Sequence, residues 1–149
     1  MLFNRLVQAI ESHSEDIVSS LVHQIRRDPE LTRLQALPEP ELRQWASGVV
    51  TRLSTWLGPH DTGVAAYVDL GRHRRQQGIP LHESVREVLT LKRTVIDFIR
   101  EHCFSNTQLE LYAEEELEHM VHGCFDRILY HFVRGYETAA ERGAVGCGR

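Results

Sequence analysis

The chain has 149 residues, of which 42% are apolar and 26% are charged, and its formal net charge is -4. This length suits one domain with a single core, and the composition is typical of a folded chain rather than a disordered one. The acidic balance argues against nucleic acid as a partner, because proteins that bind it present a dense basic face.

The chain shows no sign of a membrane or secretory segment. No apolar run reaches the roughly 20 residues that a membrane helix requires, and residues 1–16 lack the pattern of a secretory signal. We therefore expect a cytoplasmic protein without membrane contact. The three cysteines, Cys103, Cys124 and Cys147, form no CxxC pair. We expect the first two on apolar helix faces in the core.

Helical periodicity dominates the chain, and no segment alternates as a strand would. The first predicted helix runs from about Leu2 to about Arg27, where Asp28-Pro29 ends it because proline cannot donate the next hydrogen bond. After a connection, Pro40 suits the first turn of a second helix, which Gly58-Pro59 ends. The apolar face of this second helix comprises Leu42, Trp45, Val49, Leu53 and Trp56.

Three more helices follow. One begins after Asp61 or Thr62 and ends at Gly78, the next begins at Leu81, and the last runs from about Thr107 to about Glu141. We predict one helical domain over residues 1–141 and a flexible tail over 142–149. Five helices with one apolar stripe each indicate an all-α fold, a five-helix globin-like bundle. In the fourth helix the predicted inner face comprises Leu81, Val85, Val88, Leu89, Val95, Ile96 and Ile99.

Lys92 lies at the centre of that predicted inner face. Because an unpaired buried ammonium is costly, the side chain must reach solvent, pair with a carboxylate or face a polar cavity. A side chain that reaches solvent or pairs with a carboxylate would have a structural role. A side chain that faces a polar cavity would make Lys92 part of a site for an anion or a partner.

Histidines supply the candidates for a metal or haem ligand. His13 and His131 lie near the edges of apolar stripes, where an imidazole either satisfies a neighbouring polar group or ligates haem in a roomy pocket. Glu116 and His119 form half of a di-iron carboxylate signature, but a second Glu-x-x-His is missing and His119 falls on the predicted solvent face. A charged outer surface is the alternative, and residues 72–75 are likewise interpreted as a solvated basic helix end.

Four apolar side chains are candidates for a dimer interface. Trp45 and Trp56 are large enough to dominate a contact, and Leu91 and Phe98 lie off the predicted inner face of their helix. No catalytic residue is predicted, because the chain contains no GxSxG, P-loop, GxGxxG or HExxH motif.

Two stretches carry a further pattern, one spanning the predicted turn at Gly78 and one within the helix that follows it. They read Arg74-Arg75-Gln76-Gln77-Gly78-Ile79-Pro80-Leu81-His82-Glu83 and Val88-Leu89-Thr90-Leu91-Lys92-Arg93. Together they resemble the signature of the N-terminal domain of the RsbR/RsbRD stressosome co-antagonists, which is related to modules in PucR-type regulators. Lys92 occupies or adjoins an arginine position of that signature. The resemblance implies a globin-like fold that has lost haem, packs as a dimer and passes a signal to a C-terminal effector.

We therefore expect a non-catalytic sensory or regulatory domain that works without a cofactor, through homodimerisation and contact with a protein signalling partner. One alternative is a small-ligand or haem sensor that uses His131 or His13 with Lys92 nearby. Another is a ferritin-like metal-binding protein that uses Glu116 and His119.

Overall fold

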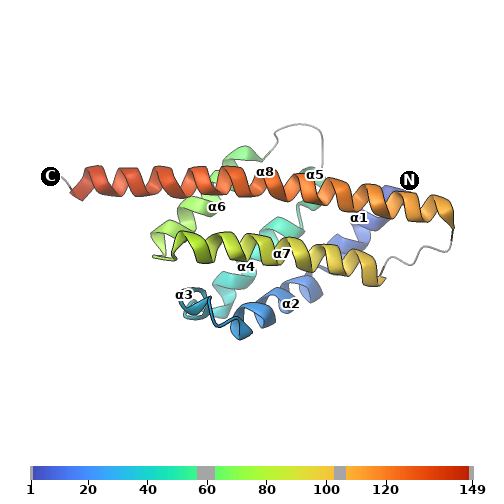
Figure 1. The fold of residues 1–149 in the computed structure, drawn as a ribbon, viewed down its shortest axis with the longest axis horizontal. Coiled ribbons are helices and arrows are strands. Elements are labelled where there is room, and N and C mark those ends of the chain that lie inside the picture. The colour runs from blue at the N-terminus through green and yellow to red at the C-terminus, as the bar shows by residue number, and fades with distance from the viewer. Residues whose placement is uncertain (1, 57–62, 103–106, 148–149) are drawn as a thin grey trace.

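The computed structural model describes residues 2–56, 63–102 and 107–147, and its regular structure in these ranges is entirely α-helical (Figure 1). This confirms the predicted all-α class. The predicted division into five helices is wrong, because the first two predicted helices are each broken and the connection between them contains a short helix. The segments are α1 (Leu2–Ser12), α2 (Ser14–Arg27), α3 (Thr32–Gln35), α4 (Glu39–Val50), α5 (Leu53–Trp56), α6 (Val64–Gln76), α7 (Leu81–His102) and α8 (Gln108–Cys147).

The first predicted helix is interrupted at His13, whose φ of -103° and ψ of 21° depart from helical values. The imidazole Nδ1 donates to the carbonyl of Ala9 at 2.8 Å and thereby competes with the backbone ladder. Glu15 and Asp16 then fall in the first turn of α2, where carboxylates favour a new helix N-terminus. These acidic residues are the signal in the sequence that predicts the break.

The second predicted helix is divided at Thr51 and Arg52, between α4 and α5. A run of β-branched residues, Val49-Val50-Thr51, lowers helix propensity there. The Thr51 hydroxyl also donates to the carbonyl of Ser47 at 2.7 Å. The predicted helix end at Asp28-Pro29 is confirmed, since α2 stops at Arg27. The predicted helix start at Pro40 is also confirmed, since α4 carries this proline in its first turn.

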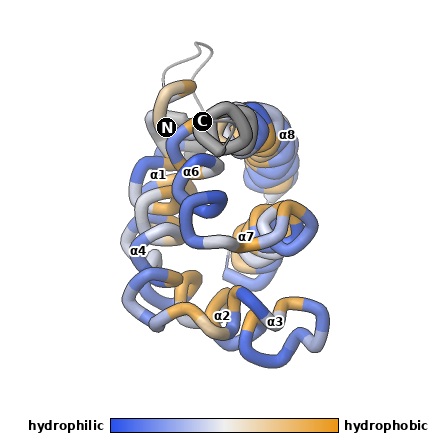
Figure 2. The backbone as a smooth tube through the Cα atoms, turned by 90° about the vertical axis from the view of Figure 1, so that its left-hand side faces the viewer, coloured by the Kyte–Doolittle hydropathy of each residue, from blue (hydrophilic) through white to orange (hydrophobic). Residues whose placement is uncertain are grey.

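The last helix is the longest element and runs along the whole molecule (Figure 1). It begins after Thr107, whose hydroxyl accepts the backbone N–H of Glu110 at 3.1 Å as a helix cap does. The sequence predicts an end near Glu141, whereas the helix continues to Cys147. At about 1.5 Å per residue its 40 residues span about 60 Å. α7 lies beside it, and α1, α6 and α4 form the opposite side (Figure 2).

One apolar core joins these helices, with large side chains such as Leu21, Leu42, Phe125 and Phe132 almost or fully excluded from solvent. Cys124 is buried within it, as predicted, and burial raises the pKa of its thiol to about 11. Cys103 and the side chain of Cys147 lie outside the described residues. The core closes most tightly where α6 crosses α8.

Two glycines allow that crossing. A Cβ atom added to Gly71 of α6 would overlap the carbonyl oxygen of Phe132, and one added to Gly135 of α8 would overlap that of Val68. Backbone therefore lies directly against backbone. We call this contact the α6–α8 seam.

The turn from α6 to α7 is attached to the same seam. Gly78 has a φ of +76°, a conformation that glycine adopts without strain, and it directs the chain into α7. The hydroxyl of Tyr136 on α8 donates to the carbonyl of Ile79 at 2.7 Å. The turn, α6 and α8 are thus held as one unit.

Candidate functional site

A fully buried ion pair joins α6 to α7. Arg74 and Glu87 each have no exposed side-chain surface. The guanidinium donates from Nε to one carboxylate oxygen at 2.8 Å and from a terminal nitrogen to the other at 2.9 Å. Such two-pronged contacts are the strongest that arginine makes with a carboxylate. Burial raises the pKa of Glu87 above its ordinary value, and the charge of Arg74 opposes that shift.

The ion pair is the centre of a larger group of contacts. The remaining terminal nitrogen of Arg74 donates to Gln77 at 2.6 Å, and Gln77 donates to Glu41 of α4 at 2.6 Å. The guanidinium also lies 5.4 Å from the centre of the Trp45 ring. We call Glu41, Trp45, Arg74, Gln77 and Glu87 the buried polar cluster after its fully buried ion pair, although Glu41 and Gln77 are half-buried. It links α4, α6 and α7, and Trp45 extends it to α8 through an edge-to-face contact with Phe132.

An open groove lies beside this cluster, between α4 and α6, with a volume of about 610 Å³. Glu41 and Trp45 belong to both the cluster and the groove wall. The groove, which we call the α4–α6 groove, has the most space of the cavities described here. Its remaining lining comprises Gln44, Gly48, Arg52, Ala66, Asp69, Leu70, Arg72, His73 and Gln76.

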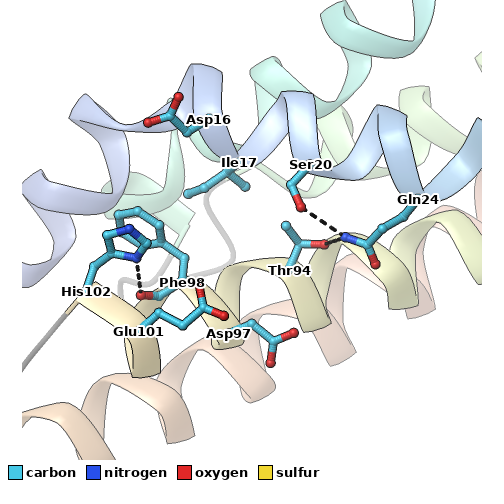
Figure 3. A pocket seen from close by; sticks show the side chains of 9 residues that line it. All are labelled: Asp16, Ile17, Ser20, Gln24, Thr94, Asp97, Phe98, Glu101 and His102. Carbon is cyan, nitrogen blue, oxygen red and sulfur yellow. Dashed lines mark hydrogen bonds between the residues drawn. The ribbon is translucent and has the colours of Figure 1, made fainter.

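A smaller cavity of about 180 Å³ lies between α2 and α7 (Figure 3). Its floor includes Gln24, which donates to Thr94 at 2.9 Å, and Phe98, whose ring stacks on His102 at 4.3 Å. Carboxylates of Asp16, Asp97 and Glu101 surround it. These acids do not converge, and within the described ranges no three metal-ligating side chains are placed to hold an ion.

Lys92 lies at the edge of the buried face of α7. Its side chain is 22% exposed, and its Nζ lies 3.8 Å from a carboxylate oxygen of Asp126 on α8. Its predicted place at the centre of the inner face is therefore wrong. The buried face of α7 is rotated about the helix axis relative to the predicted one, because it includes the polar residues Ser84, Glu87 and Thr94. Lys92 and the exposed Leu89 line a cavity of about 330 Å³ between α7 and α8.

His13 and His131 occupy different parts of the fold, and neither lines a cavity described here. His13 is exposed at the break between α1 and α2. His131 is half-buried, stacks on Tyr67 with ring centres 6.2 Å apart, and accepts a hydrogen bond from Arg134 at 3.2 Å.

The side chains predicted for a dimer interface are mostly enclosed by the chain's own fold. Leu91 has no exposed surface, Phe98 has 6% and Trp45 has 4%. The prediction that Leu91 and Phe98 lie off the inner face is wrong, because that face is turned toward them. Their surface is already used by the chain's own core. The side chain of Trp56 lies outside the described residues.

The remaining predicted residues divide between surface and core. Glu116 and His119 are both exposed on α8, on the solvent face that the helical wheel assigned to His119. The interpretation of residues 72–75 as a solvated helix end is wrong for Arg74, which is fully buried. Its neighbour Arg75 is exposed, over the ring of Tyr136.

Glu83 is a buried residue that sequence reasoning missed. It is 2% exposed, and its carboxylate accepts the backbone N–H groups of Arg33 at 3.0 Å and Leu34 at 3.4 Å. It therefore caps the short helix α3 from a distant element. Glu83 and Glu87 lie four residues apart on one face of α7, and this spacing is the signal that could have indicated a buried polar stripe.

These features define an all-α domain in which several buried polar groups link one helix to another. A family model, the RsbT co-antagonist protein rsbRD N-terminal domain, matches residues 15–146, and the chain belongs to this family. The searches of curated proteins and of solved structures gave no match. None of the described helices is long and apolar enough to cross a membrane.

The family match confirms the resemblance seen in residues 74–93. The structure explains part of that pattern, because Arg74, Gln77 and Gly78 form the ion-pair network and the turn described above. Arg74 and Gln77 are therefore links between helices, and Gly78 forms the turn that joins α6 to α7.

Proposed function

We propose that this chain is a non-catalytic sensory or regulatory domain that acts in the cytoplasm, without a cofactor, through homodimerisation and contact with a protein signalling partner. Membership of a family of RsbT co-antagonist domains supports a regulatory role. The long helix α8 contacts α1, α6 and α7 and offers a continuous rigid element through which a change in the body can act at a distance.

One observation carries the part of the proposal that concerns association. Among the described residues, the large apolar side chains that remain exposed all lie on α7 and α8. They are Leu89 at 44%, Leu109 at 75%, Leu111 at 47%, Tyr112 at 69% and Tyr130 at 63% exposure. Three of the five lie within residues 109–112 at the start of α8, and exposed apolar side chains that lie close together favour an interface.

The mass of the protein in solution tests this proposal. We expect a dimer by sedimentation at micromolar concentration, and we expect Leu109→Glu with Tyr112→Glu to shift it to monomer without loss of helix signal. Burying two carboxylates in an apolar interface is unfavourable, whereas both side chains are exposed in the protomer.

Ala65→Glu, at an exposed position of α6, is the matched control and should remain dimeric. A wild-type protein that stays monomeric would remove the dimer from the proposal. A dimer that tolerates the double substitution would move the interface elsewhere.

A small-ligand sensor is the second candidate, favoured by the α4–α6 groove. The haem alternative, with His131 or His13 as the iron ligand and Lys92 nearby, would need a different site, because neither histidine lines this groove. Reconstitution with haem checks this directly, since a sample without a Soret band would dismiss it. The ferritin-like alternative uses Glu116 and His119 as metal ligands. It is rejected if metal analysis finds no stoichiometric iron or manganese in the purified protein.

A further inference from the structure

The α4–α6 groove is left open by the residues that form its walls. Gly48 of α4 and Ala66 of α6 place almost no side chain in it. A Cβ atom added at Gly48 would meet no atom within 4 Å, so no close packing requires glycine there. Glycine inside a helix is destabilising relative to alanine. At this position its structural effect is to leave space.

Some polar side chains that line the groove have a hydrogen-bond partner, and others have none within the described residues. The carboxylates of Glu41 and Asp69 accept hydrogen bonds from Gln77 at 2.6 Å and from Arg72 at 3.0 Å. Four other lining side chains form no side-chain hydrogen bond or ion pair within the described part of the chain. They offer mainly N–H donors: one guanidinium, one imidazole and two amides. They are Gln44, Arg52, His73 and Gln76.

A buried donor lies at the inner wall of the same groove. Trp45 is 4% exposed, and its indole N–H has no hydrogen-bond acceptor within the described residues. Buried polar groups in folded proteins are nearly always hydrogen-bonded, so an unpartnered one points to a role for its site. This observation is independent of the free donors at the rim.

We propose that the α4–α6 groove binds a small molecule that carries an anionic oxygen group, either a carboxylate or a phosphate. The anionic group is recognised by Arg52 and His73, because guanidinium and imidazole donors pair with such oxygens. The volume of about 610 Å³ is within the usual range for small-molecule sites.

This assignment deepens the proposed sensory role and rests on it. Glu41 connects the groove to Arg74 through the side chain of Gln77. Trp45 connects the groove to Arg74 through the face of its ring. Trp45 also contacts Phe132 of α8. A ligand that moves either wall residue therefore acts on the contacts that join α4 to α6, α7 and α8. A binding event in the groove thus has a physical route to the long helix.

The indole N–H resonance of Trp45 in the ¹⁵N-labelled full chain measures binding, and Trp56→Phe distinguishes it from the second tryptophan. Citrate and inorganic phosphate are titrated separately into the millimolar range, so that the two arms separate carboxylate from phosphate recognition. We expect a saturable shift with at least one of them. Arg52→Gln should weaken that binding at least tenfold, since a charge-assisted contact is lost.

Gly48→Met should abolish binding by placing a side chain in the groove, with helix content unchanged because the position is free of contacts. Arg43→Gln is the matched control, since Arg43 lies on α4 outside the groove and donates to Ser19, and it should bind as the wild type does.

The proposal is overturned if neither anion produces a saturable shift of the Trp45 resonance, or if Arg52→Gln and Gly48→Met respond as the wild type does. Sedimentation of the same samples separates the two proposals. A dimer that binds no anion removes only the groove assignment. A monomer with saturable binding removes only dimerisation.

Discussion

Helix α6 meets α8 and α4 in opposite ways. Against α8 it forms the α6–α8 seam, where Gly71 and Gly135 let backbone lie against backbone. Facing α4 it leaves a groove of about 610 Å³, with Gly48 beside empty space. The same residue type therefore closes one contact and opens the other. What glycine does depends on the element opposite it.

The buried polar cluster lies between the closed and the open side. Arg74 belongs to α6, pairs with Glu87 of α7, and is linked through Gln77 to Glu41 at the groove. Because backbone lies against backbone at the seam, a change at the groove is expected to displace α4 and the cluster, and to act on α8 through the contact of Trp45 with Phe132, while the seam itself stays closed. Substitutions on each side can test this division.

The largest effect is expected at the ion pair. Glu87→Ala leaves the Arg74 guanidinium buried without its carboxylate partner, and should lower the free energy of unfolding by about 3–5 kcal/mol. The double substitution Arg74→Met with Glu87→Leu should be nearly neutral or stabilising, because it removes both desolvated charges. Urea unfolding followed by circular dichroism measures both. Equal losses in the single and double variants would contradict the assignment of the loss to an orphaned charge.

The seam and the groove can be compared directly by adding one methyl group to each. Gly71→Ala forces a Cβ atom into the backbone of α8 and should cost about 1–3 kcal/mol or more in the free energy of unfolding. Gly48→Ala meets nothing within 4 Å and should be neutral or stabilising by up to about 1 kcal/mol. Thermal and urea unfolding of the two variants decide the comparison. If they behaved alike, the closed seam would not constrain stability.

A smaller loss is expected at the turn that the seam holds. Tyr136→Phe removes the hydrogen bond to the carbonyl of Ile79 and should cost about 1–2 kcal/mol of unfolding free energy. Tyr130→Phe, at a side chain that is 63% exposed, is the matched control and should change little. Hydrogen exchange of the amides near Gly78 should rise in Tyr136→Phe alone. No such difference would show that the turn is held by packing.

The register of α7 shows where inference from a single chain fails. The predicted inner face followed the apolar residues and therefore placed Lys92 inside and Leu91 outside. The structure places Leu91 in the core and Lys92 at the edge, because Ser84, Glu87 and Thr94 are buried on the inner face. The burial of Glu87 and Thr94 depends on hydrogen-bond partners from other helices. For Glu87 that partner is Arg74, thirteen residues earlier in the chain.

Local signals were reliable where a residue's own chemistry decides its conformation. Pro29 ends a helix because it lacks an N–H group, and Gly78 turns the chain because it has no Cβ atom. The break at His13 was missed although Glu15 and Asp16 indicate it, since the apolar spacing continues across it.

The sequence by itself determined the all-α class, the positions of the main turns and the membership of the family, because helix period, proline, glycine and a local motif are properties of short segments. The tertiary structure alone decided which face of α7 is buried, which charges pair and where space is left. The free energy of burying a polar side chain depends on what lies opposite it. In this fold those partners come from distant helices.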